Sequence, residues 1–133
     1  YEISLGLVGS EMCIRDRRCI YESLALKYRY AIEQLSAVTG RAFTTLHVLG
    51  GGTKDRLLCQ MTADCCGLTV KAGPVEATAL GNIMIQLKAL GLLDSITQGR
   101  RLIAETEVIK TYTPSTQNYA EWNAAYDRFK NLL

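Results

Sequence analysis

The chain has 133 residues, enough for one small domain. Hydrophobic residues make up 48% of it and charged residues 21%, as is usual in a globular protein, and the formal net charge is +2. Because the basic residues are scattered, this balance argues against a nucleic-acid-binding surface. No apolar run reaches the roughly 20 residues that cross a bilayer, so no membrane partner is expected either. The five cysteines, an odd number with no secretory signature, predict reduced thiols and a cytoplasmic protein.

The first residues call for an interpretation of their own. Because the chain begins with Tyr1, we expect a partial sequence. Residues 4–17, SLGLVGSEMCIRDR, resemble a translated sequencing adaptor, and we expect residues 1–17 to be a leader foreign to the protein. The alternative is a genuine first strand. No basic region precedes the apolar stretch 3–9, so a signal peptide is not expected.

The first half of the chain alternates helical and strand patterns. Apolar residues recur at near-helical spacing from about Arg18 to Gly40, which predicts a helix that ends at this glycine. The following patterns predict a buried strand over residues 43–49, a glycine turn over 50–52 and a helix over 54–66 that ends at Gly67. They then predict a strand over 68–72 and a helix over 76–90 that ends at Gly91.

The second half is less regular. Its patterns predict a helix over residues 94–108, an extended segment over 108–113 and a last helix after Pro114-Ser115, whose aromatic stripe is typical of core or docking surface. The order of elements predicts an α/β fold of short parallel strands with crossover helices. Two strands alone would have open edges and would leave helix faces uncovered, so we expect part of the domain to lie upstream.

The turn Gly50-Gly51-Gly52-Thr53 is the first candidate for a functional site. Glycine allows a ligand to approach the backbone closely, and the helix that follows offers free N–H groups and the positive end of its dipole. Taken alone, the turn is a weak signal for a ligand site, because a glycine-rich turn from a strand to a helix is often only a tight connection. Its spacing matches neither the P-loop nor the dinucleotide-binding fingerprint.

Other chemistry has less support. Cys59, Cys65, Cys66 and His47 lack the paired spacing of a zinc site, so we expect buried thiols and no metal. His47 lies within the first predicted strand, where we expect it to be packed or hydrogen-bonded rather than catalytic.

The acidic residues give no catalytic constellation. Asp64, Glu76, Asp94 and Glu105 form no evident acid–base pair, so no catalytic residue is predicted. Glu76 suits the start of a helix, whereas Asp64, near the end of one, opposes the dipole and requires burial or a local partner.

The run from His47 to Leu90 resembles the adenosine-binding region of the FGGY carbohydrate kinases. The resemblance rests on a glycine turn, a helix with Leu, Gln and Ala-Asp, a short strand, a Pro-Val-Glu segment and an Ala-Leu-Gly helix. In this chain, in the same order, these are Gly50 to Gly52; Leu57, Gln60 and Ala63-Asp64; Val70; Pro74 to Glu76; and Ala79 to Gly81. Within that family, residues 72–83, AGPVEATALGNI, and residues 19–28, CIYESLALKY, are similar to members that act on L-rhamnulose.

The resemblance implies part of the C-terminal domain of a ribonuclease-H-like, actin-like ATPase fold. Residues 18–91 would be the core of the nucleotide-binding domain and residues 92–133 a C-terminal helical extension. In the family, ATP lies between two domains, and Gly51 matches the glycine that lies against it. The implied ATP-binding residues are Gly50, Gly51, Gly52 and Asp55; at the last position relatives often have asparagine, and aspartate lacks the amide donor.

The resemblance also implies a reaction. The complete enzyme would use ATP and Mg²⁺ to phosphorylate L-rhamnulose, or a related ketose, giving ADP and L-rhamnulose 1-phosphate. The family's catalytic aspartate and its Asp-x-Gly-Thr phosphate-binding turn have no counterpart in this chain, so we expect the chain alone to be inactive. The alternatives are a non-catalytic nucleotide-binding or interaction module of the same actin-like fold, and an α/β fragment without a ligand.

Overall fold

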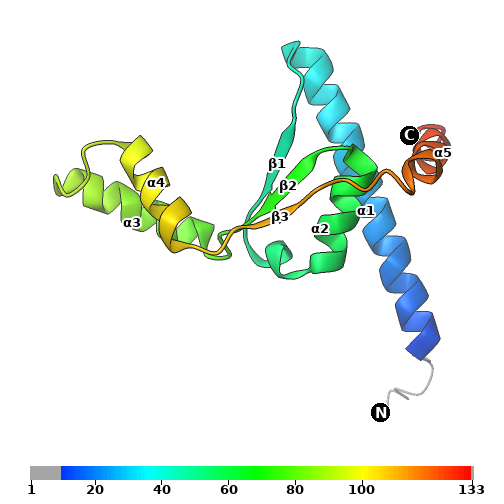
Figure 1. The fold of residues 1–133 in the computed structure, drawn as a ribbon, viewed down its shortest axis with the longest axis horizontal. Coiled ribbons are helices and arrows are strands. Elements are labelled where there is room, and N and C mark those ends of the chain that lie inside the picture. Colours follow the sequence, from blue (N-terminus) through cyan, green and yellow to red (C-terminus); the bar gives the residue numbers. More distant parts are fainter. Residues whose placement is uncertain (1–9, 133) are drawn as a thin grey trace, which may run out of the picture.

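The computed structural model describes residues 10–132, and Figure 1 shows their arrangement. The order of helices and strands along the chain is the one that the sequence patterns predict, but the first helix begins earlier, at Ser10, and the glycine turn is itself a short 3₁₀ helix. Part of the expected foreign leader, residues 1–9, lies outside the described residues, and residues 10–17 continue the first helix. The elements are α1 (Ser10–Thr39), β1 (Thr45–Val48), η2 (Gly51–Lys54), α2 (Arg56–Cys66), β2 (Thr69–Ala72), α3 (Ala77–Ala89), α4 (Ile96–Thr106), β3 (Lys110–Tyr112) and α5 (Tyr119–Lys130).

Glycines end two of these helices, as predicted. Gly40 follows α1 with a φ of 65°, and its amide donates to the Ser36 carbonyl at 2.9 Å. Gly67 follows α2 in the left-handed conformation, and its amide donates to the Ala63 carbonyl, also at 2.9 Å. Since glycine alone adopts this conformation without steric cost, the boundaries of these helices are encoded locally.

The three strands form one sheet in the order β1-β2-β3. β1 and β2 are parallel, with Thr45 opposite Thr69, and α2 is the crossover between them, as predicted. β3 pairs antiparallel with β2, with Val70 opposite Tyr112. The expectation of parallel strands is therefore confirmed for β1 and β2 and does not extend to β3: the chain leaves the end of β2, forms α3 and α4, and re-enters at that same end.

Helix α2 covers one face of the sheet. Cys59 and Ala63 on α2 pack against Val70 and Ala72 of β2, and all four are at most 3% exposed. Leu46 and Val48 of β1 and Tyr112 of β3 complete this core from the same face, as the two-residue repeat of a strand requires. The prediction that Cys59 and Cys65 are buried is confirmed, whereas Cys66 is half-buried.

A second core joins the ends of the chain. Ala25 and Leu26 of α1, Cys65 of α2 and Tyr126 of α5 are buried together, with Trp122 among the residues packed around them. Trp122, Tyr126 and Phe129 of the aromatic stripe therefore belong to this core, one of the two roles expected for the stripe, whereas Tyr119 is exposed. In Figure 1, α5 lies beside the crossing of α1 and α2.

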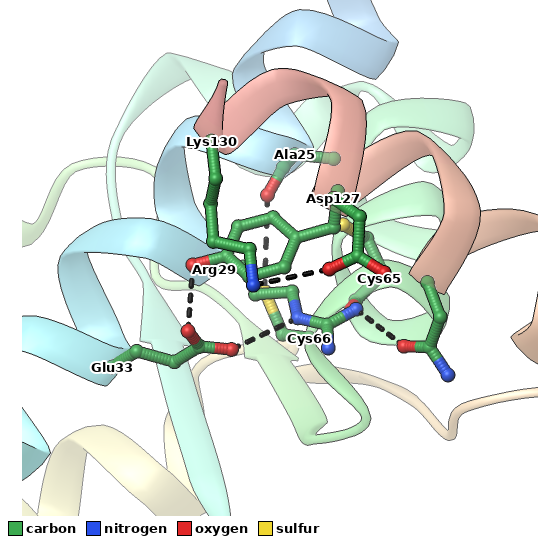
Figure 2. Close-up of polar contacts among 9 residues, drawn as sticks. Ala25, Arg29, Glu33, Cys65, Cys66, Asp127 and Lys130 are labelled. Atoms are coloured by element: carbon green, nitrogen blue, oxygen red, sulfur yellow. Dashed lines mark hydrogen bonds and ion pairs between the residues drawn. The ribbon is translucent and has the colours of Figure 1, made fainter. Parts of the chain in front are cut away.

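Arg29 links the three helices around this second core (Figure 2). Its guanidinium contacts Glu33 at 3.1 Å, donates to the Cys65 carbonyl at 3.3 Å and donates to Asn123 Oδ1 at 2.9 Å. It also lies 4.2 Å from the centre of the Tyr126 ring. The Arg29 side chain thus donates to a carbonyl at the end of α2 and connects α1 to α5.

Asp64 has the local partner that its position requires, and a distant one as well. Its Oδ1 accepts hydrogen bonds from Gln60 Nε2 and from the Ser115 amide, both at 2.8 Å. Gln60 also donates to the Thr113 carbonyl at 2.9 Å. The end of α2 therefore holds the segment that leads from β3 into α5.

Two expectations for the first strand are wrong. β1 is half-buried instead of buried, because it is an edge strand whose second edge has no partner among the described strands. His47 is exposed, and within the described part of the chain it makes no side-chain hydrogen bond. It lies on the face of the sheet opposite α2, since the neighbouring Leu46 and Val48 face the helix.

Helices α3 and α4 form an arm beside the sheet. They pack on each other at Gly99, which is buried: a Cβ atom there would overlap the Met84 side chain. Figure 1 shows the arm at the end of the sheet, on the side away from α1 and α5. In the part of the chain that the structure describes, no helix combines the length and the apolar content needed to cross a membrane.

Tyr112 offers a simple test of the core beneath α2. Its hydroxyl is buried and lacks a hydrogen-bond partner among the described residues. An unsatisfied buried hydroxyl costs roughly 1–3 kcal/mol. We therefore expect Tyr112→Phe to keep or raise the free energy of unfolding measured in urea, and a loss of more than about 1 kcal/mol would mean that the hydroxyl has a partner.

Candidate functional site

The candidate site lies at the carboxyl ends of the two parallel strands. The glycine turn follows β1, and the turn at Gly73-Pro74 follows β2. Two backbone hydrogen bonds join them: the Gly50 amide donates to the Pro74 carbonyl at 3.2 Å, and the Gly73 amide donates to the Val48 carbonyl at 2.9 Å. Ligands of open α/β sheets bind at this edge, beyond the carboxyl ends of the strands.

Gly50 is the residue that the turn requires to be glycine. Its φ of 82° and ψ of −161° lie in a region that other residues rarely adopt. Its carbonyl accepts from the Thr53 amide at 3.1 Å and from the Thr53 hydroxyl at 2.7 Å. The turn is therefore held internally, by a threonine that is itself buried.

Gly51 and Gly52 are glycines for another reason. Neither has a positive φ, and a Cβ atom added to either would meet no atom within 4 Å. The fold as described would thus accept a side chain at both positions. Their amides are the first two of η2 and have no intrahelical acceptor. These two residues present bare backbone to open space, which is what a ligand in close contact would need.

Asp55 links the turn to α2. Its amide donates to the Gly52 carbonyl at 3.2 Å, so it closes η2. Its Oδ1 accepts from the Leu58 amide at 3.0 Å, so it also caps the N-terminus of α2. Its Oδ2 accepts from the hydroxyl of Tyr21 on α1. The hydrogen bonds from Tyr21 and Leu58 hold the pKa of Asp55 below its usual range. The hydrogen bond to Asp55 in turn raises the pKa of Tyr21.

The structure brings together all four residues predicted from the sequence, since Gly50, Gly51, Gly52 and Asp55 form one continuous turn. Tyr21 was missed, because it is 34 residues away and nothing local marks it. The capping role of Asp55 could have been found: an aspartate two residues before the apolar pair Leu57-Leu58 is a helix-start signal. Because the predicted helix began at Lys54, Asp55 fell inside it and its capping role was not predicted.

Two grooves border helices α1 and α2, and one of them reaches the glycine turn. A groove of about 420 Å³ is lined by α1, β1 and α2 and reaches Gly52; its walls are largely apolar and include Tyr28, Leu35 and Leu49. A second groove, of about 600 Å³, lies between α1, α2 and α5 and includes Trp122. Among the residues whose side chains the structure describes, no three His, Cys, Asp or Glu side chains are grouped as metal ligands.

A family of proteins matches this chain. Residues 16–90, more than half of its length, match the C-terminal domain of the FGGY family of carbohydrate kinases, and the matched stretch contains the whole glycine turn. The chain therefore belongs to the FGGY family of carbohydrate kinases.

Several rhamnulokinases are similar to this chain. A rhamnulokinase from Bacteroides thetaiotaomicron is 50% identical over 116 residues, which is 87% of this chain and 24% of the relative. Rhamnulokinases from Enterobacter sp. (strain 638) and Klebsiella pneumoniae are 43% and 44% identical over 112 and 98 residues, covering 84% and 74% of this chain. The chain spans a fifth to a quarter of the length of these relatives.

Proposed function

We propose that this chain is part of an ATP-dependent sugar kinase and supplies one side of its ATP site. The observation that carries the proposal is the open backbone at Gly51 and Gly52, at the carboxyl ends of parallel strands, in a chain of the FGGY family. The complete enzyme would phosphorylate L-rhamnulose to L-rhamnulose 1-phosphate, a substrate suggested by the names of the relatives.

The fold fits a larger domain. β1 has an unpaired edge among the described strands, and apolar side chains such as Leu35 and Leu49 remain exposed beside it. A further strand at this edge would extend the sheet toward a ribonuclease-H-like, actin-like domain. Residues 18–91 would be its nucleotide-binding core, and residues 92–133 would add β3 and two helices. We infer that residues 1–17 are foreign to it; Figure 1 shows the start of α1 projecting beyond the other elements. The described cysteines are free, which suits a cytoplasmic protein.

The residues of the turn suit the nucleotide but not its metal ion. Two unpaired amides and a helix N-terminus can receive polar atoms of ATP, and the missing Cβ atoms leave space for the ligand. Mg²⁺ would neutralise charge on the phosphates when bound. Because the described side chains form no group of three metal ligands, its protein ligands would come from elsewhere in the complete enzyme.

The role left to this chain is binding and orientation. Its turn would hold the nucleoside part of ATP by backbone contacts, while groups outside the chain activate the sugar hydroxyl and receive the phosphates. Orientation of bound reactants is a large part of phosphoryl-transfer catalysis, so one half-site can matter greatly without a catalytic residue.

The test separates nucleotide binding from turnover. When ATP is titrated into the ¹⁵N-labelled chain, the amide signals of Gly51 and Gly52 should shift in a saturable way, and ATP should raise the melting temperature. The same sample should give no ATP-dependent phosphorylation of L-rhamnulose or another ketose. Absence of shifts at the glycine amides would overturn the ATP-site proposal, and measurable turnover would overturn the assignment of the catalytic groups to another part of the enzyme.

A further inference from the structure

Asp55 has both carboxylate oxygens engaged by this chain. Oδ1 receives the Leu58 amide and Oδ2 receives the Tyr21 hydroxyl. The carboxylate is partly buried between α1 and the start of α2. A carboxylate fixed by two donors from different directions has a single orientation, and its own backbone amide ends η2. The side chain of Asp55 therefore determines how the glycine turn joins α2.

Tyr21 provides the link between this junction and the rest of the fold. It lies on α1, 34 residues before Asp55, and α1 packs along α2 through Ala25 and Leu26. Among the described residues, no other side-chain hydrogen bond joins α1 to residues 50–55. Tyr21 thus connects the turn to the most extensive helix of the structure.

We propose that Tyr21 is a positioning residue for the nucleotide turn: its hydroxyl fixes Asp55, which in turn fixes the direction of the Gly51 and Gly52 amides. The proposal rests on the function proposed above. It also assigns Asp55 a role that differs from direct donation to the nucleotide, because an ionised carboxylate has no proton to donate. The lowered pKa of Asp55 keeps this carboxylate ionised at neutral pH.

The competing explanation is that the contact between Tyr21 and Asp55 only adds stability. The two explanations differ in what the loss of the hydroxyl changes. A stabilising contact alters the free energy of unfolding and leaves the affinity of the folded chain for ATP unchanged. A positioning contact alters the affinity of the folded chain and the protection of the turn amides, and both effects depend on the carboxylate of Asp55.

The variant Tyr21→Phe keeps the ring and removes the hydroxyl. We expect the Kd for ATP, measured from amide shifts of the folded chain, to rise about fivefold, the factor that corresponds to about 1 kcal/mol for one hydrogen bond. Hydrogen exchange at the Thr53 and Asp55 amides, which donate to the Gly50 and Gly52 carbonyls, should accelerate by a similar factor without ATP, while exchange at Cys65 stays unchanged. Tyr30→Phe, on the same helix but outside the lining of both grooves, is the matched control and should change neither quantity.

Two further variants separate the explanations. Asp55→Asn retains an acceptor for the Leu58 amide and can donate to the Tyr21 oxygen, so it should keep the Kd within about twofold. In an Asp55→Ala background the effect of Tyr21→Phe should disappear, because contacts that act as one unit are not additive. An equal effect of Tyr21→Phe in both backgrounds would overturn the proposal, as would unchanged exchange and Kd in Tyr21→Phe. One outcome would count against the proposed function: no ATP-dependent amide shifts in the unsubstituted chain, although hydrogen exchange of the turn still responds to Tyr21→Phe. The role of Tyr21 in nucleotide binding would then be overturned as well.

Discussion

Replacement of Tyr126 by alanine is expected to lower the free energy of unfolding by about 3 kcal/mol, within the range for aromatic residues removed from a core. The ring is 2% exposed and packs on Ala25, Leu26 and Cys65. Its hydroxyl donates to Glu33 Oε2 at 2.6 Å, and Arg29 lies over its face. Burial and the contact with Glu33 raise the pKa of Tyr126, so the hydroxyl stays protonated as a donor at neutral pH. Urea unfolding followed by the fluorescence of Trp122, which belongs to the same core, measures the loss.

Two other variants show which part of Tyr126 matters. Tyr126→Phe retains the ring and should lose only about 1 kcal/mol, the contribution of one hydrogen bond. Tyr119→Ala removes an aromatic residue of the same helix that is 52% exposed, and it should change stability by less than about 0.5 kcal/mol. If Tyr126→Ala cost no more than Tyr119→Ala, α5 would not be docked on α1 and α2 as described.

Substitution of Gly51 by alanine is expected to weaken ATP binding by about tenfold or more, since one methyl group forced into a close contact costs roughly 1–3 kcal/mol. Stability should be kept or slightly raised. The φ of Gly51 is not positive and its Cβ position is open, so alanine strains nothing and reduces the freedom of the unfolded chain. ATP titration and urea unfolding of the same sample measure the two effects, which should have opposite signs.

Gly81→Ala provides the matched control for Gly51→Ala. Gly81 also lacks a positive φ and has open space at its Cβ position, but it lies in α3, outside the glycine turn. It should raise stability and leave the Kd for ATP unchanged. A Gly51→Ala chain that binds ATP as tightly as the unsubstituted chain would show that the nucleotide does not approach this glycine.

Features encoded by neighbouring residues could be predicted from the sequence. The helical repeat of apolar residues indicated α1 and α2, and Gly40 and Gly67 marked their ends, because a left-handed residue after a helix is a local requirement. The glycine turn could be placed between a strand and a helix for the same reason. The structure confirms that placement, since η2 lies between β1 and α2.

Features that depend on distant residues could not be predicted. The antiparallel pairing of β3 with β2 joins segments about 40 residues apart, and no local pattern gives the direction of a strand. Each of Asp64 and Asp55 has one distant donor, from Ser115 and Tyr21, which are 51 and 34 residues away. Asp64 nevertheless carried a usable signal: a carboxylate that opposes a helix dipole implied a partner, although not which one.

The arm formed by α3 and α4 begins and ends at one place, because Ala72 is opposite Lys110 where β2 ends and β3 begins. In topological terms the arm is an insertion into a two-stranded hairpin, and antiparallel neighbours need only a short turn to connect them. Opening of the arm would then leave the pairing of β2 with β3 intact. Hydrogen exchange should consequently resolve two cooperative units, the arm and the sheet with its three helices, and chain-length variation among relatives should be tolerated best in this insertion.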